Sequence, residues 1–531
     1  MGRRMNRREL LAESLVVGGG LGARLAGADG QAVALTPAGQ ESSHCFGIHV
    51  MDAQTGRGVP LVELRTVNNI RYYTDSAGYA AVEGTGLENK KTYFFVSSPG
   101  YEYPKDGFGY AGVALDLKPG ASAIITIKRN NIAHRLYRIT GEGIYRDSVM
   151  LGHPTPIRQP LLNGNVLGQD SVQAVIYHGK IHWIWGDTLQ PAYPLGNFRS
   201  SGALSDVPGK GGLNPDVGIN LRYFTDQKTG FCRAMCPLPD EPGGVVWLDG
   251  LTVIASKAGR ELMVTRYGRY AGMTKLLDQG LALWDDQARI FRKYADFSSS
   301  ETWRFPSGHP AVYRDGGVEY RLFCPQFGFP TARARADLAA LADSDSYEGF
   351  TCLASGTAYR GVNSKMDRGP DGKIMWGWKR DTEPLDADQE RKLLKAGLIK
   401  PHETHFQLTE AHTGQPLNIH GGSFFWNDYL KKWIMIAGQI GGTSLLGEIW
   451  FAQADAPTGP WTRAIKIATH PDYSFYNPTQ HPFFDQQGGK IIYFEGTYSA
   501  TFSGNAHPTP RYDYNQIMYG LDLSDPRLAG A

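Results

Sequence analysis

The sequence has no apolar run long enough to cross a membrane. A mild apolar run at residues 15–21 is too short, because a membrane-spanning helix needs about 20 apolar residues. No later window is long and apolar enough either. The sequence therefore predicts no membrane span.

Cysteine is scarce, with five residues in a chain of 531. The number is odd and the density is too low for a disulfide scaffold. Cys232 and Cys236 are close enough in sequence to pair after export, but a single Cys-x3-Cys motif without a second ligand pair is weak support for a zinc site. The other three are Cys45, Cys324 and Cys352.

Charge of one sign is not in excess. Lys and Arg number 54 against 52 Asp and Glu, so the formal net charge is only +2. No overall field attracts this chain to nucleic acid. We expect no nucleic-acid partner, and recognition of any ligand must be local.

Glycine, proline and aromatic residues are abundant. The chain has 65 Gly and 31 Pro, together with 23 Phe, 11 Trp and 27 Tyr. Many tight turns combined with aromatic strand formers favour an all-β class. At about 100 to 200 residues per domain, the length predicts two to four domains.

The first residues have the layout of a removable export signal. Residues 1–28 combine a basic start, the mild apolar run and small residues at 26–28. The pair Arg7-Arg8 followed by apolar residues resembles a twin-arginine signal, which implies a periplasmic or extracellular bacterial protein. A basic, disordered start of a cytoplasmic protein is the alternative. Residues 29–43 are small and polar, and we expect a linker there.

Residues 44–130 are predicted to form a β-sandwich. Strand patterns at 59–67, 92–96 and 123–127 surround a turn pattern at 75–78. The order Val50-Met51-Asp52-Ala53-Gln54-Thr55-Gly56-Arg57-Gly58-Val59-Pro60, followed by Thr74-Asp75-Ser76-Ala77-Gly78-Tyr79, resembles the carboxypeptidase regulatory-like, transthyretin-like domain. That resemblance implies an accessory module without chemistry of its own. A connector is expected at 131–150.

A strand-turn-strand phrase recurs across residues 151–524. The clear instances lie at 169–185, 308–323, 421–436 and 480–495, with weaker ones at 245–256 and 371–378. At roughly 65 to 75 residues per unit, this length favours a five-bladed β-propeller. Residues 386–396 have a capping pattern and predict a helix, and residues 331–341 are a second candidate.

Propeller geometry predicts where the site lies. The start of each innermost strand and the end of the following strand meet at one face near the axis. In this sequence the strand starts carry Asp170, His309, His420 and His481, and the strand ends carry Asp187 and Glu495. We therefore expect three carboxyl groups and three imidazoles to converge.

Paired carboxyl groups are the requirement for hydrolysing a glycosidic bond, one as acid and one as base or nucleophile. We assign Asp170 as base and Glu495 as acid, with Asp187 setting pKa or position. The residues expected to bind substrate are His309, His420, His481, Trp185, Arg511 and Tyr512. Each has an alternative role: an acid can cap a turn, and an imidazole can bind backbone, an ion or water.

The stretch Glu448-Ile449-Trp450-Phe451-Ala452-Gln453-Ala454-Asp455-Ala456-Pro457-Thr458-Gly459-Pro460-Trp461 resembles a phrase of five-bladed propeller glycosidases, such as glycoside hydrolase families 43 and 117. In family 43 a general-base Asp begins the first inner strand, which matches Asp170 by position. That family also uses an Asp that tunes pKa and a Glu that acts as acid, each from a later blade. Here His309 and His481 stand at predicted inner-strand starts where an acid is expected, so these two roles cannot be carried over one for one. The resemblance also makes an axial Ca²⁺ conceivable, although no cofactor is required.

The resulting hypothesis is an exported bacterial glycoside hydrolase whose partner is a polysaccharide or oligosaccharide. Two alternatives stay open. A polysaccharide lyase would use His481, Tyr512 and Arg511 as base and charge-neutralising groups. A non-catalytic propeller would bind glycans without cleaving them.

Overall fold

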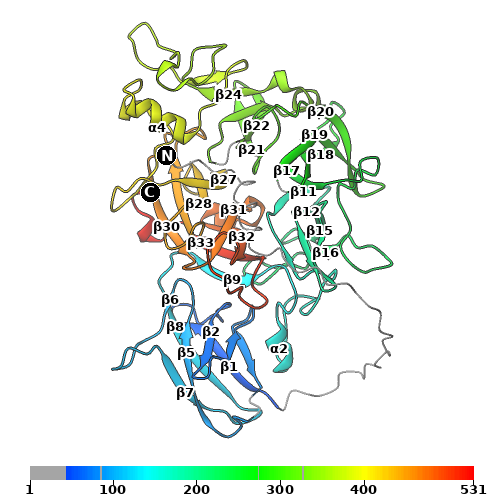
Figure 1. Ribbon diagram of the computed structural model, residues 1–531, viewed down its shortest axis with the longest axis vertical. Coiled ribbons are helices and arrows are strands. Elements are labelled where there is room, and N and C mark those ends of the chain that lie inside the picture. The colour runs from blue at the N-terminus through cyan, green and yellow to red at the C-terminus, as the bar shows by residue number, and fades with distance from the viewer. Residues whose placement is uncertain (1–43, 84–85, 273, 326–327) are drawn as a thin grey trace. The chain divides into compact units, whose positions relative to one another are not determined.

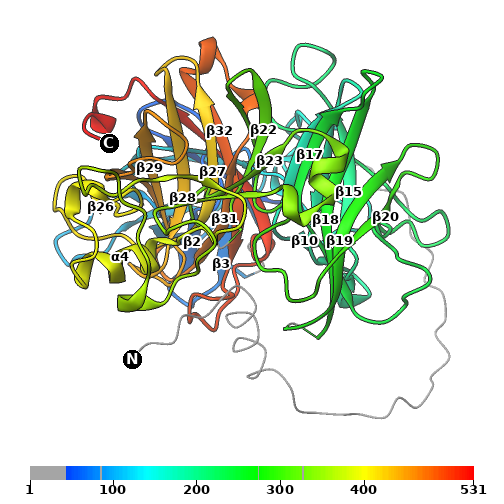
Figure 2. The ribbon, with the colours of Figure 1, turned by 90° about the horizontal axis from the view of Figure 1, so that it is seen from above.

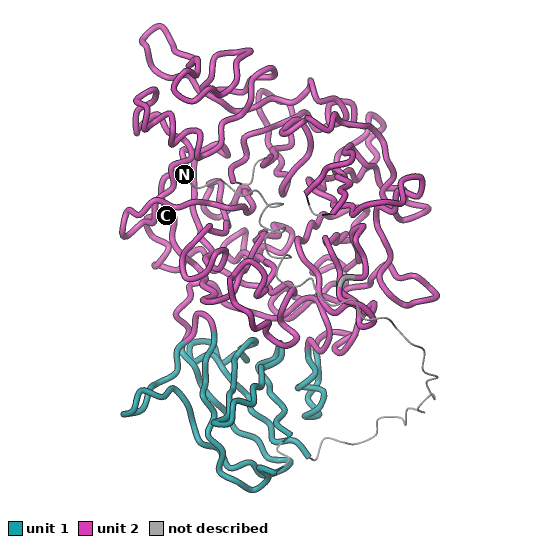
Figure 3. Tube along the Cα trace, in the orientation of Figure 1, with its two compact units in different colours: residues 1–98, 102–128, 145–155 teal, residues 99–101, 129–144, 156–531 magenta. Residues whose placement is uncertain are grey.

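The computed structural model describes residues 44–83, 86–272, 274–325 and 328–531. The predicted export signal at 1–28 and linker at 29–43 lie outside the described residues. The described chain divides into two compact units (Figure 3). The first comprises residues up to 98, 102–128 and 145–155, and the second comprises residues 99–101, 129–144 and 156–531.

The first unit is a β-sandwich of two four-stranded sheets, with strand orders β4-β1-β8-β6 and β3-β2-β5-β7. The side chains of β5 alternate, so that Thr92, Phe94 and Val96 are buried while Tyr93 and Phe95 are half-buried, as expected for a sheet with one covered face. The elements are β1 (Phe46–Asp52), β2 (Glu63–Thr66), β3 (Arg71–Tyr73), β4 (Tyr79–Val82), β5 (Lys91–Ser97), β6 (Tyr101–Glu102), β7 (Gly112–Asp116), β8 (Ser122–Arg129) and the short helix α2 (Arg146–Met150).

Two buried carboxylates attach α2 to this sandwich. Asp75 Oδ2 accepts a hydrogen bond from the Ser148 backbone N–H at 2.6 Å, and Asp147 Oδ1 accepts one from the Ala81 N–H at 2.9 Å. Burial raises the pKa of Asp75 to about 6. Asp75 also begins the turn expected from the sequence, since Gly78 N–H donates to its carbonyl.

The second unit is a five-bladed β-propeller, which confirms the predicted fold class. Five sheets form the ring, and all their strand pairs are antiparallel except β26 with β30 (Figures 1 and 2). Neighbouring blades contact each other through β11 and β17, β21 and β27, and β27 and β31. These contacts identify the inner strands. Blade 1 is β11 (Gln173–Tyr177), β12 (Lys180–Trp185), β15 (Ser201–Asp206) and β16 (Arg222–Tyr223); blade 2 is β17 (Val245–Ala255), β18 (Glu261–Ala271), β19 (Lys275–Asp285) and β20 (Ile290–Phe297).

The other three blades complete the ring. Blade 3 is β21 (Ala311–Asp315), β22 (Val318–Phe323), β23 (Ala332–Arg335), β24 (Glu348–Thr351) and β25 (Gly377–Lys379); blade 4 is β27 (Ile419–Asn427), β28 (Lys432–Gln439), β29 (Glu448–Ala454), β30 (Arg463–Thr469) and β26 (Thr409–Glu410); blade 5 is β31 (Ser474–Gln480), β32 (Ile491–Ser499), β33 (Asn515–Asp522) and β9 (His134–Arg138). Because β9 precedes all other propeller strands and pairs with β33, blade 5 joins the two ends of the ring without a covalent bond.

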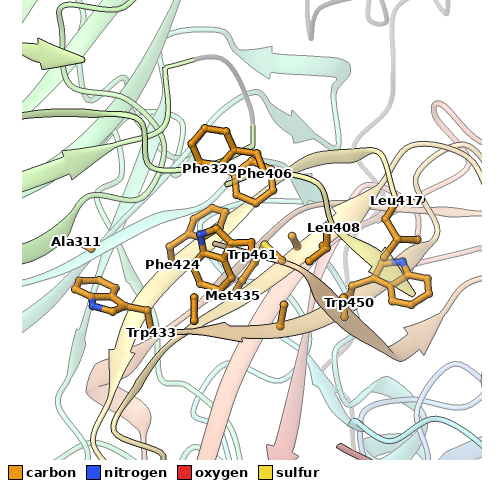
Figure 4. Close-up of a cluster of buried hydrophobic side chains, with 14 of the residues drawn as sticks. Ala311, Phe329, Phe406, Leu408, Leu417, Phe424, Trp433, Met435, Trp450 and Trp461 are labelled. Atoms are coloured by element: carbon orange, nitrogen blue, oxygen red, sulfur yellow. The ribbon is translucent and has the colours of Figure 1, made fainter. Parts of the chain in front are cut away.

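Aromatic and aliphatic clusters fill the spaces between blades. The cluster between blades 3 and 4 contains Phe329, Phe406, Phe424 and Trp461 (Figure 4), and the cluster between blades 5 and 1 contains Trp183, Trp185, Phe484 and Tyr493. We call the latter the 5/1 wall. Burial of these large side chains contributes the main stabilisation of the ring.

Helices are few and lie between strands. α4 (Ala387–Lys395) has the predicted capping box, in which Asp386 accepts from the Gln389 N–H and the Gln389 side chain accepts from the Asp386 N–H. The helix predicted at 331–341 is largely wrong, because its first half forms β23 and only α3 (Leu338–Ala342) is helical. Arg333 is held in β23 by ion pairs with Asp315 and Glu348.

The remaining elements are 3-10 turns and one small sheet. The turns are η1 (Ser344–Ser346), η2 (Gly361–Asn363), η3 (Pro401–Glu403), η4 (Pro482–Phe484), η5 (Gln487–Gly489) and η6 (Pro526–Leu528); the sheet is β10 (Gly168–Gln169), β13 (Thr188–Gln190) and β14 (Tyr193–Asn197). No helix in the described ranges has the length and apolar character needed to cross a bilayer. Cys232 and Cys236 are both buried free thiols.

Candidate active site

Two sheets place Asp170 beside Asp187. In the small sheet β10 pairs with β13, with Gln169 opposite Thr188, and in blade 1 β11 pairs with β12. The two connecting segments lie between these sheets, and the Gly186 N–H donates to the Asp170 carbonyl at 2.8 Å. The end of β12 therefore meets the segment that leads into β11. We call this end of the inner strands the axial rim.

The Asp170 carboxylate is held by three hydrogen-bond donors. Oδ1 accepts from the Asp187 backbone N–H at 3.0 Å, while Oδ2 accepts from Ser171 Oγ at 3.0 Å and from Tyr476 Oη at 3.4 Å. A side chain at Gly186 would place its Cβ 2.4 Å from Oδ1, so this close approach requires glycine. These donors fix the position of the carboxylate.

Asp187 lies next to this carboxylate and is oriented from the neighbouring blade. Its Oδ1 accepts a hydrogen bond from Trp247 Nε1 of β17 at 3.0 Å. Asp170 and Asp187 are both 7% exposed. The rim thus carries two acidic residues in backbone contact, and the carboxylate of each has a defined donor.

A third rim acid, Asp249, was missed by the sequence analysis. Its Oδ1 accepts from the Gly308 N–H of blade 3 at 3.0 Å and from Gln173 Nε2 of blade 1 at 3.5 Å. A bulge in β17 after Asp249, where Gly250 has φ 68°, brings the carboxylate to this position. The weak repeat at 245–256 contained the residue, but a bulge is not visible in strand alternation.

His309 and His420 lie at inner-strand starts of blades 3 and 4. His309 follows Gly308, which contacts Asp249, and is half-buried. His420 is 6% exposed and occupies the bulge between Ile419 and Gly421 at the start of β27. Both residues therefore lie at the same end of the inner strands as Asp170.

The predicted position of His481 at the start of an inner strand is wrong. The inner strand of blade 5 is β31, and His481 follows its last residue, Gln480. Residues 482–489 form η4 and η5 rather than a tight turn between two strands. The repeat predicted at 480–495 therefore does not coincide with an inner strand and its partner, because β31 ends where the repeat begins.

Glu495 is likewise placed in the 5/1 wall and not on the axial face. It pairs with Thr479 within the sheet, and its Oε1 lies 2.6 Å from His481 Nε2. Glu495 is 0% and His481 2% exposed, and the imidazole packs edge-on against Trp183. Both side chains are therefore buried within the wall.

Three further residues expected to bind substrate have structural partners. Trp185 is 1% exposed and packs in the 5/1 wall beside Trp183. Arg511 forms an ion pair with Glu142 at 3.3 Å, and Tyr512 is 2% exposed with the Arg138 guanidinium over its ring. Trp185 and Tyr512 are thus closed to a ligand, whereas the Arg511 side chain is exposed and paired.

The part of the chain that the structure describes holds no group of three His, Cys, Asp or Glu side chains arranged to bind a metal ion. Glu448, at the start of β29, accepts from Thr443 Oγ1 at 2.6 Å and lies 3.2 Å from Lys466 Nζ. These contacts are those of a buried structural acid.

Comparison with known proteins found no matching family model and no matching curated relative. Solved structures do match. An α-L-arabinofuranosidase from Fusarium graminearum in complex with an iminosugar inhibitor has 12% identity and a TM-score of 0.34, covering 74% of this chain and 99% of that one. An α-L-arabinanase from Penicillium chrysogenum complexed with arabinobiose has 11% identity and a TM-score of 0.33, covering 74% and 99%.

A third match is a GH43_1 enzyme from Xanthomonas citri complexed with xylose, at 11% identity and a TM-score of 0.32, covering 68% of this chain and 88% of that one. Likenesses at this level assign no substrate and no residue role to this chain. The roles below rest on its own geometry.

Proposed function

We propose that the propeller hydrolyses glycosidic bonds at the axial rim, with Asp170 and Asp187 as the reacting pair. The observation that carries this proposal is that two acidic residues in contact at the rim have carboxylates with different hydrogen-bond partners. Asp170 receives hydrogen bonds from Asp187 N–H, Ser171 and Tyr476, whereas Asp187 is oriented by Trp247. Two neighbouring carboxyl groups with different surroundings divide into one ionised and one protonated group.

In this assignment Asp170 is the ionised member and acts as base or nucleophile. Asp187, beside an existing negative charge, retains its proton and donates it to the leaving oxygen. If Asp170 acts as base, the proton of the attacking water passes to its carboxylate while the glycosidic C–O bond breaks. His309 and His420, at the inner-strand starts of blades 3 and 4, are assigned to hydrogen-bond sugar hydroxyls.

Glu495 receives a different role from the one that the sequence indicated. Its contact with His481 and its complete burial favour a structural function in the 5/1 wall. Asp187 takes over the role of acid in this proposal. Asp249 bridges blades 1 and 3 and sets the position and charge of the rim.

The experiment is a screen of the purified chain against a panel of polysaccharides and oligosaccharides, with reducing ends and ultraviolet absorbance read together. We expect new reducing ends without absorbance. D170N and D187N should each lose about 10²- to 10⁴-fold in kcat/KM, whereas E495Q should retain catalysis in its folded fraction. D240N, which changes an exposed acid, is the matched control.

Four results would contradict the proposal. Full activity of D170N would exclude its role, and loss in E495Q equal to that in D170N at unchanged stability would restore Glu495 as the acid. Products that absorb in the ultraviolet would indicate a lyase. Glycan retention without cleavage would indicate a binding propeller.

Export and an accessory role for the sandwich complete the proposal. Residues 1–28, with Arg7-Arg8, support a twin-arginine signal. The expected outcome is a processed protein in the periplasm or medium of the source cells, and its loss after substitution of both arginines by lysine. Retention of the unprocessed chain in the cytoplasm would contradict export.

A further inference from the structure

A cavity of about 390 Å³ lies on blade 1 of the propeller, between β16 and the segment that follows β9. We call it the lateral cavity. Its lining includes Ile139, Arg158, Gln159, Asn163, Asn220 and Tyr223. The volume lies near the lower end of the range of about 300 to 1,000 Å³ for small-molecule sites, which suits one or two sugar rings better than a polymer.

The lateral cavity combines apolar walls with groups that are fixed in position. Ile139 and Leu221 are buried in its lining. The Tyr223 ring is held because its hydroxyl donates to Gln169 Oε1 at 2.7 Å. Asn220 is held because its Oδ1 accepts from the Arg158 backbone N–H at 2.8 Å. A ligand here meets a preformed surface, which lowers the entropic cost of binding.

Arg158 is the positively charged side chain of the lateral cavity that can pair with a ligand. Arg222, also in the lining, pairs with Asp206 at 2.9 Å. In contrast, the Arg158 guanidinium makes no hydrogen bond or ion pair with any residue in the described ranges, and its side chain is exposed. Arg511, the residue that the sequence singled out for binding an acidic sugar, is already paired with Glu142.

We propose that the lateral cavity binds a monoanionic sugar, specifically a hexuronate whose carboxylate pairs with Arg158. A planar guanidinium matches a carboxylate through two parallel hydrogen bonds. Gln159, Asn163 and Asn220 supply amides at the edge for ring hydroxyls, and the apolar walls cover the C–H faces. This inference goes beyond the proposed function and does not depend on turnover at Asp170.

One hydrogen bond links the lateral cavity to the axial rim. The hydroxyl of Tyr223, in the cavity lining, donates to Gln169, and Gln169 is followed in the sequence by Asp170. A bound uronate would hold an acidic glycan by a second point on the same blade that carries the proposed base. The site therefore adds selectivity for acidic glycans without contributing to bond cleavage.

The test measures binding to the full chain by isothermal titration calorimetry, in a D170N background so that no substrate is consumed. The probes are D-glucuronate, D-galacturonate, the corresponding neutral hexoses, acetate and inorganic phosphate. We expect at least one uronate to bind at least tenfold more tightly than its neutral hexose. R158Q should weaken that binding at least tenfold, whereas R260Q, which alters an exposed arginine in the blade 2 hairpin, should not.

Several outcomes would overturn the inference. Uronate binding that R158Q leaves unchanged would place the ligand elsewhere, including at the rim. Equal binding of acetate or phosphate would show an anion site without sugar recognition. No uronate binding, or equal binding of neutral hexoses, would remove the acidic sugar from the proposal. Unchanged thermal unfolding of R158Q confirms that a loss of binding is local.

Discussion

The acids at the axial rim and the acids near the 5/1 wall have opposite surroundings. Asp170 and Asp187 are bonded to N–H and O–H donors at the ends of strands. Glu495 is fully buried and Asp485 is half-buried near aromatic side chains, with His481 and Gln480 as their respective partners. All four occur in or beside the same repeated phrase of the sequence.

The difference teaches that a carboxyl group near a propeller axis is not by itself a catalytic group. Hydrogen-bond donors stabilise an ionised carboxylate that can act on a ligand, whereas burial without sufficient donors penalises the charge. The kind of partner separates the two sets: backbone N–H, hydroxyl and indole donors at the rim, against an imidazole or a single amide near the wall. Stability should therefore respond to changes in the wall, and activity should respond to changes at the rim.

The largest expected effect on stability comes from breaking the buried pair in the wall. E495A leaves the His481 imidazole buried without its partner, and we expect a loss of about 3 to 5 kcal/mol in the free energy of unfolding. E495Q keeps a polar group in place and should lose less. Denaturant unfolding checks both values, with D240N as the control.

The activity of the folded fraction sharpens the contrast. E495A should keep the kcat of the parent when corrected for the amount of folded protein. A loss of less than 1 kcal/mol in E495A, together with an activity loss as large as that of D170N, would reverse the assignment of rim and wall.

Asp485 gives a smaller effect that depends on pH. Burial raises the pKa of Asp485 to about 7, and hydrogen bonds from Gln480 only partly oppose the shift. Because an unfolded Asp titrates near pH 4, the folded state binds the extra proton between about pH 4 and 7. The stabilisation that this bound proton gives to the folded state is fully present below about pH 4 and is lost as the pH rises through 7.

D485N removes this titration. We expect the variant to be more stable than the parent at pH 8, by up to roughly 4 kcal/mol, and similar to it at pH 4. Urea unfolding at both pH values measures the difference. Parallel pH profiles for parent and variant would mean that Asp485 does not retain its proton in the folded state.

The sequence predicted the propeller and the rim more successfully than it predicted the wall. The phrase Trp185-Gly186-Asp187 correctly marks the end of a second strand, and the segment containing Asp170 precedes the first one, so their proximity follows from the repeat. In blade 5, Asn477 has φ 50° within a bulged β31, and Pro482 begins a 3-10 turn. Such local distortions depend on tertiary packing and shift the register of the pattern.

The buried His481–Glu495 pair shows a second limit of prediction from the sequence, which concerns the direction of a side chain. A His or Glu beside an aromatic strand has the same sequence signal whether its side chain points to the axis or between two blades. Only the pairing of β31 with β32, and the position of Trp183 on the neighbouring blade, decide this. Asp249 was hidden for a related reason, since the bulge at Gly250 turns its carboxylate to the rim.

The smallest expected effect tests how the rim orients its acid. W247F keeps an aromatic ring but removes the Nε1–H that donates to Asp187. Loss of a donor to the ionised form makes Asp187 hold its proton more tightly, so we expect kcat/KM to fall about tenfold and the alkaline limb of the pH–rate profile to move to higher pH.

W426F is the matched control, because Trp426 makes the same kind of bond to Asp428, at 3.1 Å, on an exposed turn of blade 4. A tenfold loss in W247F with an unmoved alkaline limb would assign Trp247 to substrate binding instead of to the acid. An equal loss in W426F would show that the effect is not specific to the rim.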